Sequence, residues 1–298
     1  MPSPRHIPHP TVAVALLVTV LPACRTTPEP APPQRRWLPD SVPFESEAPT
    51  SSADGQPPVP RTQLSISFQL LRVELPLGAV SDSQKLWNHV DEEALGSDQA
   101  MLMRQNGFRI GLGQPADWPA VQAILVASHP TLAKRKAVNL QTAYPLAIED
   151  GQPKRDQTIF YYRPDGTLAG QSVDQSRNVL RIDHQIDPQG ADAVLLRVLP
   201  EIRRRDTGLQ MFRTQDGFKQ LPAYEGVSIR DLSFTIRVPD GWFLVIAPGP
   251  RVNQTGLIGR EFMSCSGHDG RYEFVYVIWP TITRSLVGPP PDGNAQNR

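Results

Sequence analysis

A thiol, an imidazole and a carboxylate lie close together near the end of the sequence, at Cys265, His268 and Asp269. A nucleophilic cysteine needs a base within hydrogen-bond reach and a third group that orients the base. Side chains this close in sequence usually point apart, and the flanking Gly267 and Gly270 indicate a turn. A polar hairpin loop is therefore the favoured interpretation, and Cys265 and His268 are kept as candidates for a nucleophile and its base. The pair supplies only two of the three or four ligands that zinc requires, so no metal site is predicted.

A second candidate is His184, which lies between Asp183 and Asp187. These residues could form an acid–base group. Neighbours along a strand face opposite sides, however, which favours an exposed polar strand face instead. The sequence also has none of the familiar catalytic or dinucleotide-binding motifs. We therefore predict no catalytic residue and no cofactor.

The charge composition argues against a nucleic-acid partner. The chain has 30 basic and 30 acidic residues, whereas a nucleic-acid binder should show a basic excess or a basic stripe. The short run Arg203-Arg204-Arg205 is interpreted as a solvated turn or strand end. No nucleic-acid partner is predicted.

The first folded part is predicted at residues 63–132. Ile66, Phe68 and Leu70 alternate as in a strand. Ser81 and Gln84 have the spacing of a capping box, so a helix is expected to begin there. A second helix is expected up to Gly107, then a short strand at 108–112, then a third helix from Asp117 to Pro130. The expected unit is a small βααβα subdomain.

Short strands separated by turn residues dominate residues 133–286. They are expected at 144–148, 158–162, 168–173, 179–186, 194–199, 234–238, 242–246 and 272–278. The turn Arg163–Gly166 predicts one hairpin, and Pro239-Asp240-Gly241 predicts another between 234–238 and 242–246. The predicted fold class is α+β, mostly β, with the βααβα unit followed by an antiparallel, hairpin-rich β domain.

The two ends of the chain are predicted to lie outside these domains. Residues 12–21 are apolar but too few to span a bilayer, which needs about 20 residues. Their length suits the core of a signal peptide at 1–23. Residues 24–62 are rich in proline and polar residues and are expected to form a disordered tether. A disordered tail is expected at 287–298.

The segment Leu21-Pro22-Ala23-Cys24 resembles the lipobox of bacterial lipoproteins. The resemblance implies that Cys24 is the lipid-attachment residue, with its thiol diacylated and the preceding peptide removed. Several acyl chains on one residue hold a protein firmly, whereas one chain holds it only marginally. Arg25 after the cysteine implies, by the sorting rule of Gram-negative envelopes, an outer-membrane lipoprotein that faces the periplasm.

A further resemblance covers roughly residues 190–285. The Pro200-Glu201 pair, the Asp240-Gly241 turn, the segment Gly256–Phe262 and the last strand ending at Pro280 follow one another as in the core of bacterial secretins. The whole chain is also similar to lipoproteins common in planctomycete-type genomes, which implies no activity.

Two functional hypotheses follow. The first is a non-enzymatic envelope lipoprotein with a structural or protein-binding role, of which a secretin-like assembly component is one version. Its partners would be the lipid bilayer, through acylated Cys24, and copies of itself or other envelope proteins. The alternative is an anchored periplasmic hydrolase or small-ligand-binding protein that uses His184, or Cys265 with His268.

Overall fold

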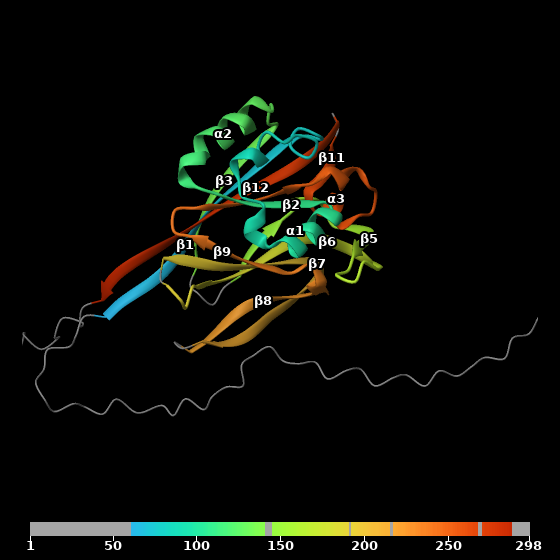
Figure 1. Cartoon of the computed structure of the whole chain (residues 1–298). Coiled ribbons are helices and arrows are strands. Elements are labelled where there is room, and N and C mark those ends of the chain that lie inside the picture. The colour runs from blue at the N-terminus through green and yellow to red at the C-terminus, as the bar shows by residue number, and fades with distance from the viewer. Residues whose placement is uncertain (1–60, 141–144, 191, 215–216, 268–269, 288–298) are drawn as a thin grey trace, which may run out of the picture. The chain divides into compact units, whose positions relative to one another are not determined.

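Two long strands from opposite ends of the folded chain form the centre of one sheet. The computed structural model describes residues 61–140, 145–190, 192–214, 217–267 and 270–287 (Figure 1). In it β1 (Arg61–Pro76) pairs antiparallel with β12 (Gly270–Val287), from Arg61 opposite Val287 to Pro76 opposite Tyr272. The alternation of Ile66, Phe68 and Leu70 puts these side chains on one face, as the sequence predicts.

Within the described residues, the strands form two antiparallel sheets. The first sheet has the order β2-β10-β12-β1-β3, with β11 paired to β12. The second sheet has the order β4-β6-β7-β8, with β5 paired to β6 and β9 paired to β7. The remaining bounds are β2 Phe108–Gly113, β3 Leu132–Leu140, β4 Leu146–Glu149, β5 Arg155–Tyr162, β6 Leu168–Ile186, β7 Ala193–Thr214, β8 Gly217–Ser228, β9 Phe234–Pro239, β10 Phe243–Pro248 and β11 Ser264–Gly267.

The main hydrophobic core is shared by both sheets. Phe68 and Tyr276 of the first sheet and Ile182 and Leu196 of the second belong to one buried cluster. A half-buried sheet hides one face only, so two such faces packed together remove both from water. The predicted class, α+β and mostly β, is confirmed.

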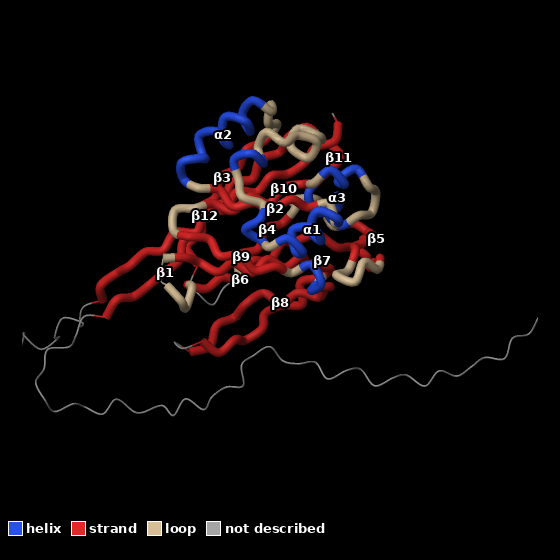
Figure 2. Tube along the Cα trace, in the orientation of Figure 1, coloured by secondary structure: helices blue, strands red, loops and turns tan. Residues whose placement is uncertain are grey.

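The helices are short and cover two different places (Figure 2). α2 (Trp118–Ala127) buries Val121 and Leu125 against the face of the first sheet that points away from the main core. α1 (Ser97–Gln105) and α3 (Ile258–Met263) contribute side chains to the main core itself. In the described part of the chain, no helix is long and apolar enough to cross a membrane.

The predicted hairpin around Pro239-Asp240-Gly241 is wrong. Both strands form, but β9 pairs with β7 in the second sheet and β10 pairs with β2 and β12 in the first. The turn therefore passes the chain from one sheet to the other. The apolar run of β10, buried along its whole length, finds long-range partners that local turn chemistry does not reveal.

The helix expected to begin at Ser81 is also wrong. Residues 77–82 form turns, and short 3-10 turns follow at Trp87–His89 and Glu93–Leu95. The buried Glu273 side chain explains the difference, because its carboxylate accepts backbone hydrogen bonds from Val80 at 2.5 Å, Gly78 at 3.1 Å and Ser81 at 3.2 Å. These bonds hold the amides in a turn around the carboxylate.

Residues on both sides of the predicted boundary at 132 share one sheet. β1 lies between β12 and β3, and β2 pairs with β10. The predicted signal peptide, most of the tether and the tail after Val287 lie outside the described residues. Of the predicted tether, residues 61 and 62 already belong to β1.

Candidate functional site

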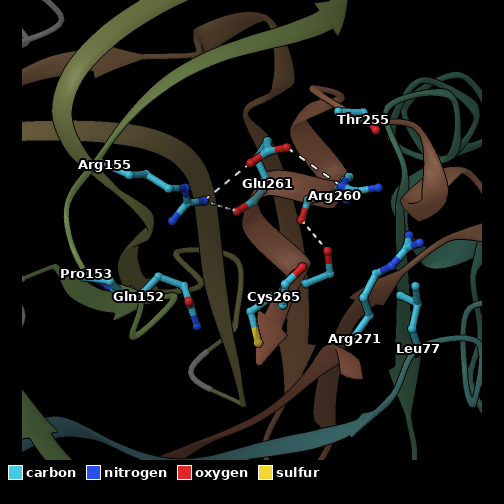
Figure 3. A pocket seen from close by; sticks show the side chains of 11 residues that line it. Leu77, Gln152, Pro153, Arg155, Thr255, Arg260, Glu261, Cys265 and Arg271 are labelled. Carbon is cyan, nitrogen blue, oxygen red and sulfur yellow. Dashed lines mark hydrogen bonds and ion pairs between the residues drawn. The ribbon is translucent and has the colours of Figure 1, made fainter. Parts of the chain in front are cut away.

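A pocket of about 290 Å³ lies where β11, α3 and the loop before β5 meet (Figure 3). We call it the arginine pocket, because Arg155, Arg260 and Arg271 reach it from three separate segments. Its other lining residues include Gln152, Glu261 and Cys265. Binding sites commonly combine a concave surface with a few convergent polar groups, which is the arrangement seen here.

Arg155 is held between two carboxylates. Its Nη1 donates to Asp150 Oδ2 at 3.3 Å, and its Nη2 donates to the Glu261 backbone oxygen at 3.2 Å and to Glu261 Oε2 at 3.5 Å. Figure 3 shows Arg155 and Arg260 approaching Glu261 from opposite sides. Burial raises the pKa of Asp150 above its ordinary value, and the hydrogen bond from the Gln152 N–H and the Arg155 charge only partly oppose this effect.

The Arg260–Glu261 segment is fixed by close backbone packing. Gly259 donates its N–H to the Asn106 oxygen at 2.9 Å, and a Cβ on Gly259 would lie 2.4 Å from that oxygen. Asn178 Nδ2 donates to the Glu261 oxygen at 2.7 Å from the other side. The two bonds place α3 firmly, so Arg260 and Glu261 are presented to the pocket by a rigid turn.

Of the three arginines that line the pocket, Arg271 has no carboxylate as an ion-pair partner among the described residues. It lies at the start of β12 and is exposed. In the described parts of the chain, Arg271 forms no ion pair, while Arg155 pairs with Asp150 and Glu261. The arginine pocket therefore has more positive than negative side chains along its lining, and an anionic group is the ligand that it favours.

The Cys265 thiol lines the pocket, and its described surroundings favour the neutral form. Burial raises the pKa of Cys265, and the nearby Glu74 carboxylate raises it further. The thiolate is the reactive form of cysteine, so this environment opposes nucleophilic attack. His268, the base suggested by the sequence, lies outside the described residues, as does the lipid-attachment residue Cys24.

His184 is buried, which corrects the expected exposed strand face. Only 7 % of its surface is accessible, and its ring packs edge-on against Phe68 with 4.9 Å between the ring centroids. Among the described residues, neither ring nitrogen has a hydrogen-bond partner, and burial lowers the pKa of His184. It is not among the residues that line the arginine pocket.

The two aspartates beside His184 belong to separate ion pairs. Asp183 Oδ1 pairs with Arg181 at 2.9 Å, and Asp187 Oδ2 pairs with Arg237 at 2.7 Å. The hydrogen bond from Arg237 lowers the pKa of Asp187. These contacts split the group suggested by the sequence. Among the described residues, no cluster of three or more histidine, cysteine or acidic side chains could hold a metal ion.

The arginine run at 203–205 also differs from the expected solvated turn. Arg203 lies within β7, only 6 % exposed, and pairs with Glu201 at 2.9 Å. Its guanidinium also stacks on Tyr224 at 4.1 Å from the ring centroid. Arg204 is exposed and lies 3.5 Å from Glu225. The arginines that do form a site, Arg155, Arg260 and Arg271, are scattered in sequence, and no local pattern reveals them.

No family model and no curated protein matches the chain. Among solved structures it has a weak resemblance to secretin subunits. For the type IV competence pilus secretin PilQ of V. cholerae, the identity is 11%, the TM-score is 0.21, and the match covers 76% of this chain and 61% of that one.

Two further structures give similar values. A chain of the Klebsiella pneumoniae type II secretion outer membrane complex (PulD, PulS and the PulC HR domain) has 12% identity, a TM-score of 0.19, and coverage of 76% of this chain and 40% of that one. The InvG secretin domain β-barrel from Salmonella has 12% identity, a TM-score of 0.17, and coverage of 80% and 66%. The chain spans less than two thirds of each of these three proteins, and scores this low do not establish a common fold.

Proposed function

We propose that this protein is a non-enzymatic envelope lipoprotein whose arginine pocket holds a carboxylate-bearing segment of a partner protein. The observation that carries the proposal is Arg271, a pocket cation without an ion-pair partner in the described chain, beside Arg155 and Arg260. Arginine suits this task because its planar guanidinium binds a carboxylate through two parallel hydrogen bonds.

The neutral Cys265 thiol supports binding over catalysis. A cysteine hydrolase would need this thiol ionised near neutral pH, whereas burial and Glu74 raise its pKa. His184, the other candidate for a base, is buried beside Phe68 of the shared core, and neither nitrogen has a hydrogen-bond partner among the described residues. A base buried at this place cannot contact a substrate bound at the surface.

The lipid anchor belongs to the same proposal. Acyl chains on Cys24 would hold the protein at the outer membrane, on its periplasmic side, and Arg25 after the cysteine supports that destination. Mass spectrometry of the first peptide of the membrane-extracted protein tests the anchor. The expected result is a peptide that begins at Cys24 and carries acyl groups, and the Cys24→Ala variant should leave the membrane fraction. An unmodified Cys24, or an intact Met1, would contradict the proposal.

The partner site is tested by crosslinking in the intact envelope. A photoreactive amino acid at Ser266, which is exposed and lines the pocket, should form an adduct with one envelope protein that mass spectrometry identifies. The same group at the exposed Asp165, at the tip of the β5–β6 turn, should not form it. An adduct with a second copy of this chain would identify self-assembly, the arrangement expected of a secretin-like component.

A charge reversal separates the pocket from general electrostatics. Arg271→Glu should reduce the Ser266 adduct about tenfold or more, because a carboxylate would then face a carboxylate. Arg204→Glu changes the net charge equally on an exposed site outside the pocket and should leave the adduct unchanged. Equal loss in both variants, or no loss in either, would refute binding through the arginine pocket.

A further inference from the structure

A second hollow, of about 270 Å³, lies on the far side of the first sheet from the main core. We call it the apolar groove. Its walls are Leu71 and Val73 of β1, Ala133 of β3, and Trp118, Leu125 and Val126 of α2. It shares no lining residue with the arginine pocket, so it is a separate site.

The groove exists because α2 covers the centre of the sheet but leaves its edge open. Leu125 is buried against the sheet, whereas Val126, one residue on, is 64% exposed at the rim. β3 is the edge strand, and its Ala133 lies opposite Val73 in the register. The short alanine side chain leaves the floor of the groove unfilled. A concave surface lined mostly by apolar side chains with a few polar groups is typical of ligand sites.

The lining is mostly apolar, with one amide, Gln122, and one cation. Arg135 lines the groove, lies opposite Leu71 in the register and is exposed. In the described part of the chain, it forms no ion pair. Its neighbours Lys134 and Lys136 are also exposed, but strand alternation directs them to the opposite face of the sheet. The groove is therefore complementary to a ligand with one apolar chain and one negative charge.

We propose that the apolar groove binds a linear, medium-chain fatty acid. Its alkyl chain lies along α2 against Leu71 and Val73, and its carboxylate pairs with Arg135. Binding of the alkyl chain removes the apolar lining of the groove from water, and Arg135 donates a charge-assisted hydrogen bond to the carboxylate. The volume, below the roughly 300–1,000 Å³ of sites for drug-sized ligands, suits a single short chain.

Titration of the full-length Cys24→Ala protein with decanoate and with decanol tests the proposal. Removing Cys24 leaves no acyl group of the protein's own to compete. Trp118 lines the groove, so its fluorescence should report binding, and calorimetry should give the affinity. Decanoate should bind more tightly than decanol. From hexanoate to decanoate, affinity should rise about fourfold per buried methylene, the ratio that ~0.8 kcal/mol gives.

Two variants and one control locate the ligand. Arg135→Gln should weaken decanoate about tenfold and leave decanol unchanged, because only the carboxylate loses its partner. Ala133→Leu should fill the floor and weaken both ligands without disturbing the buried core, since Ala133 is exposed. Lys134→Gln, the matched charge change on the opposite face, should alter neither. An absence of decanoate binding, or decanoate binding that survives both Arg135→Gln and Ala133→Leu, would overturn the proposal.

Discussion

His184 is a buried imidazole that must remain neutral. Its ring packs against Phe68 of the shared core, and within the part of the chain that the structure describes both nitrogens lack a hydrogen-bond partner. Burying an unpaired polar group costs roughly 1–3 kcal/mol, and charging it there costs more. The residue is therefore a source of instability rather than of chemistry, and the cost grows in acid.

Replacing His184 by leucine should change how stability depends on pH. Burial lowers the pKa of His184 in the folded protein, whereas in the unfolded chain the pKa keeps its ordinary value of 6.5. Below pH 6.5 the unfolded chain therefore binds a proton more readily than the folded protein does. The free energy of unfolding should fall as pH drops from that value toward the lower folded-state pKa. His184→Leu should remove this part of the slope and gain about 1 kcal/mol at neutral pH. Urea unfolding of the wild type and of His184→Leu at a series of pH values measures the pH slope and the gain in stability. Parallel curves for the two proteins would contradict the expectation.

At the same scale, the sequence revealed residue types but not their environments. Strand alternation correctly predicts that Asp183 and His184 lie on opposite faces of the strand. Which of these two faces is buried depends on β1, more than a hundred residues earlier, because Phe68 of β1 packs against the His184 ring. The cysteine was predicted as a candidate from its neighbour His268. Its pKa is instead governed by burial and by Glu74, which no spacing along the chain indicates.

At the scale of elements, local signals predicted the strands better than their partners. The turn at Arg163–Gly166 forms as expected, with the Gly166 N–H donating to the Arg163 oxygen at 2.9 Å, and β5 pairs with β6. The edge strand β3 and the whole of β8 were missed. Charged residues interrupt the apolar alternation of β3, since its Lys134, Arg135 and Lys136 are all exposed.

α3 depends on one close approach, at Gly259. A methyl group there would lie 2.4 Å from the Asn106 oxygen, so Gly259→Ala must move α3 or break the bond that Gly259 donates. We expect a loss of about 2 kcal/mol or more in the free energy of unfolding, together with a weaker Ser266 adduct, because α3 carries Arg260 and Glu261.

Gly190→Ala is the control for this substitution. A methyl group at Gly190 meets only the end of the Asp192 side chain, which can move aside. Its cost should stay within about 0.5 kcal/mol. Chemical denaturation of both variants measures the difference, and an equal cost at the two glycines would show that the packing of α3 is not the cause.

At the scale of the whole folded part, the two sheets should unfold together. All described residues lie in one compact unit, and one buried cluster joins the two sheets. Phe68→Ala should therefore lower the stability of both sheets by about 3–5 kcal/mol. Urea transitions followed by tryptophan fluorescence and by far-ultraviolet circular dichroism should coincide in the wild type and the variant. Two separate transitions would contradict a shared core.

The pairing of β1 with β12 also bears on how the chain can be re-engineered. Arg61 and Val287 are opposite each other at the end of this ladder, so a brief peptide could join them. New ends could then be opened at the exposed β5–β6 turn, where Gly166 faces open space. Such a circular permutant would keep every strand partner of the two described sheets and place a fused reporter at the β5–β6 turn.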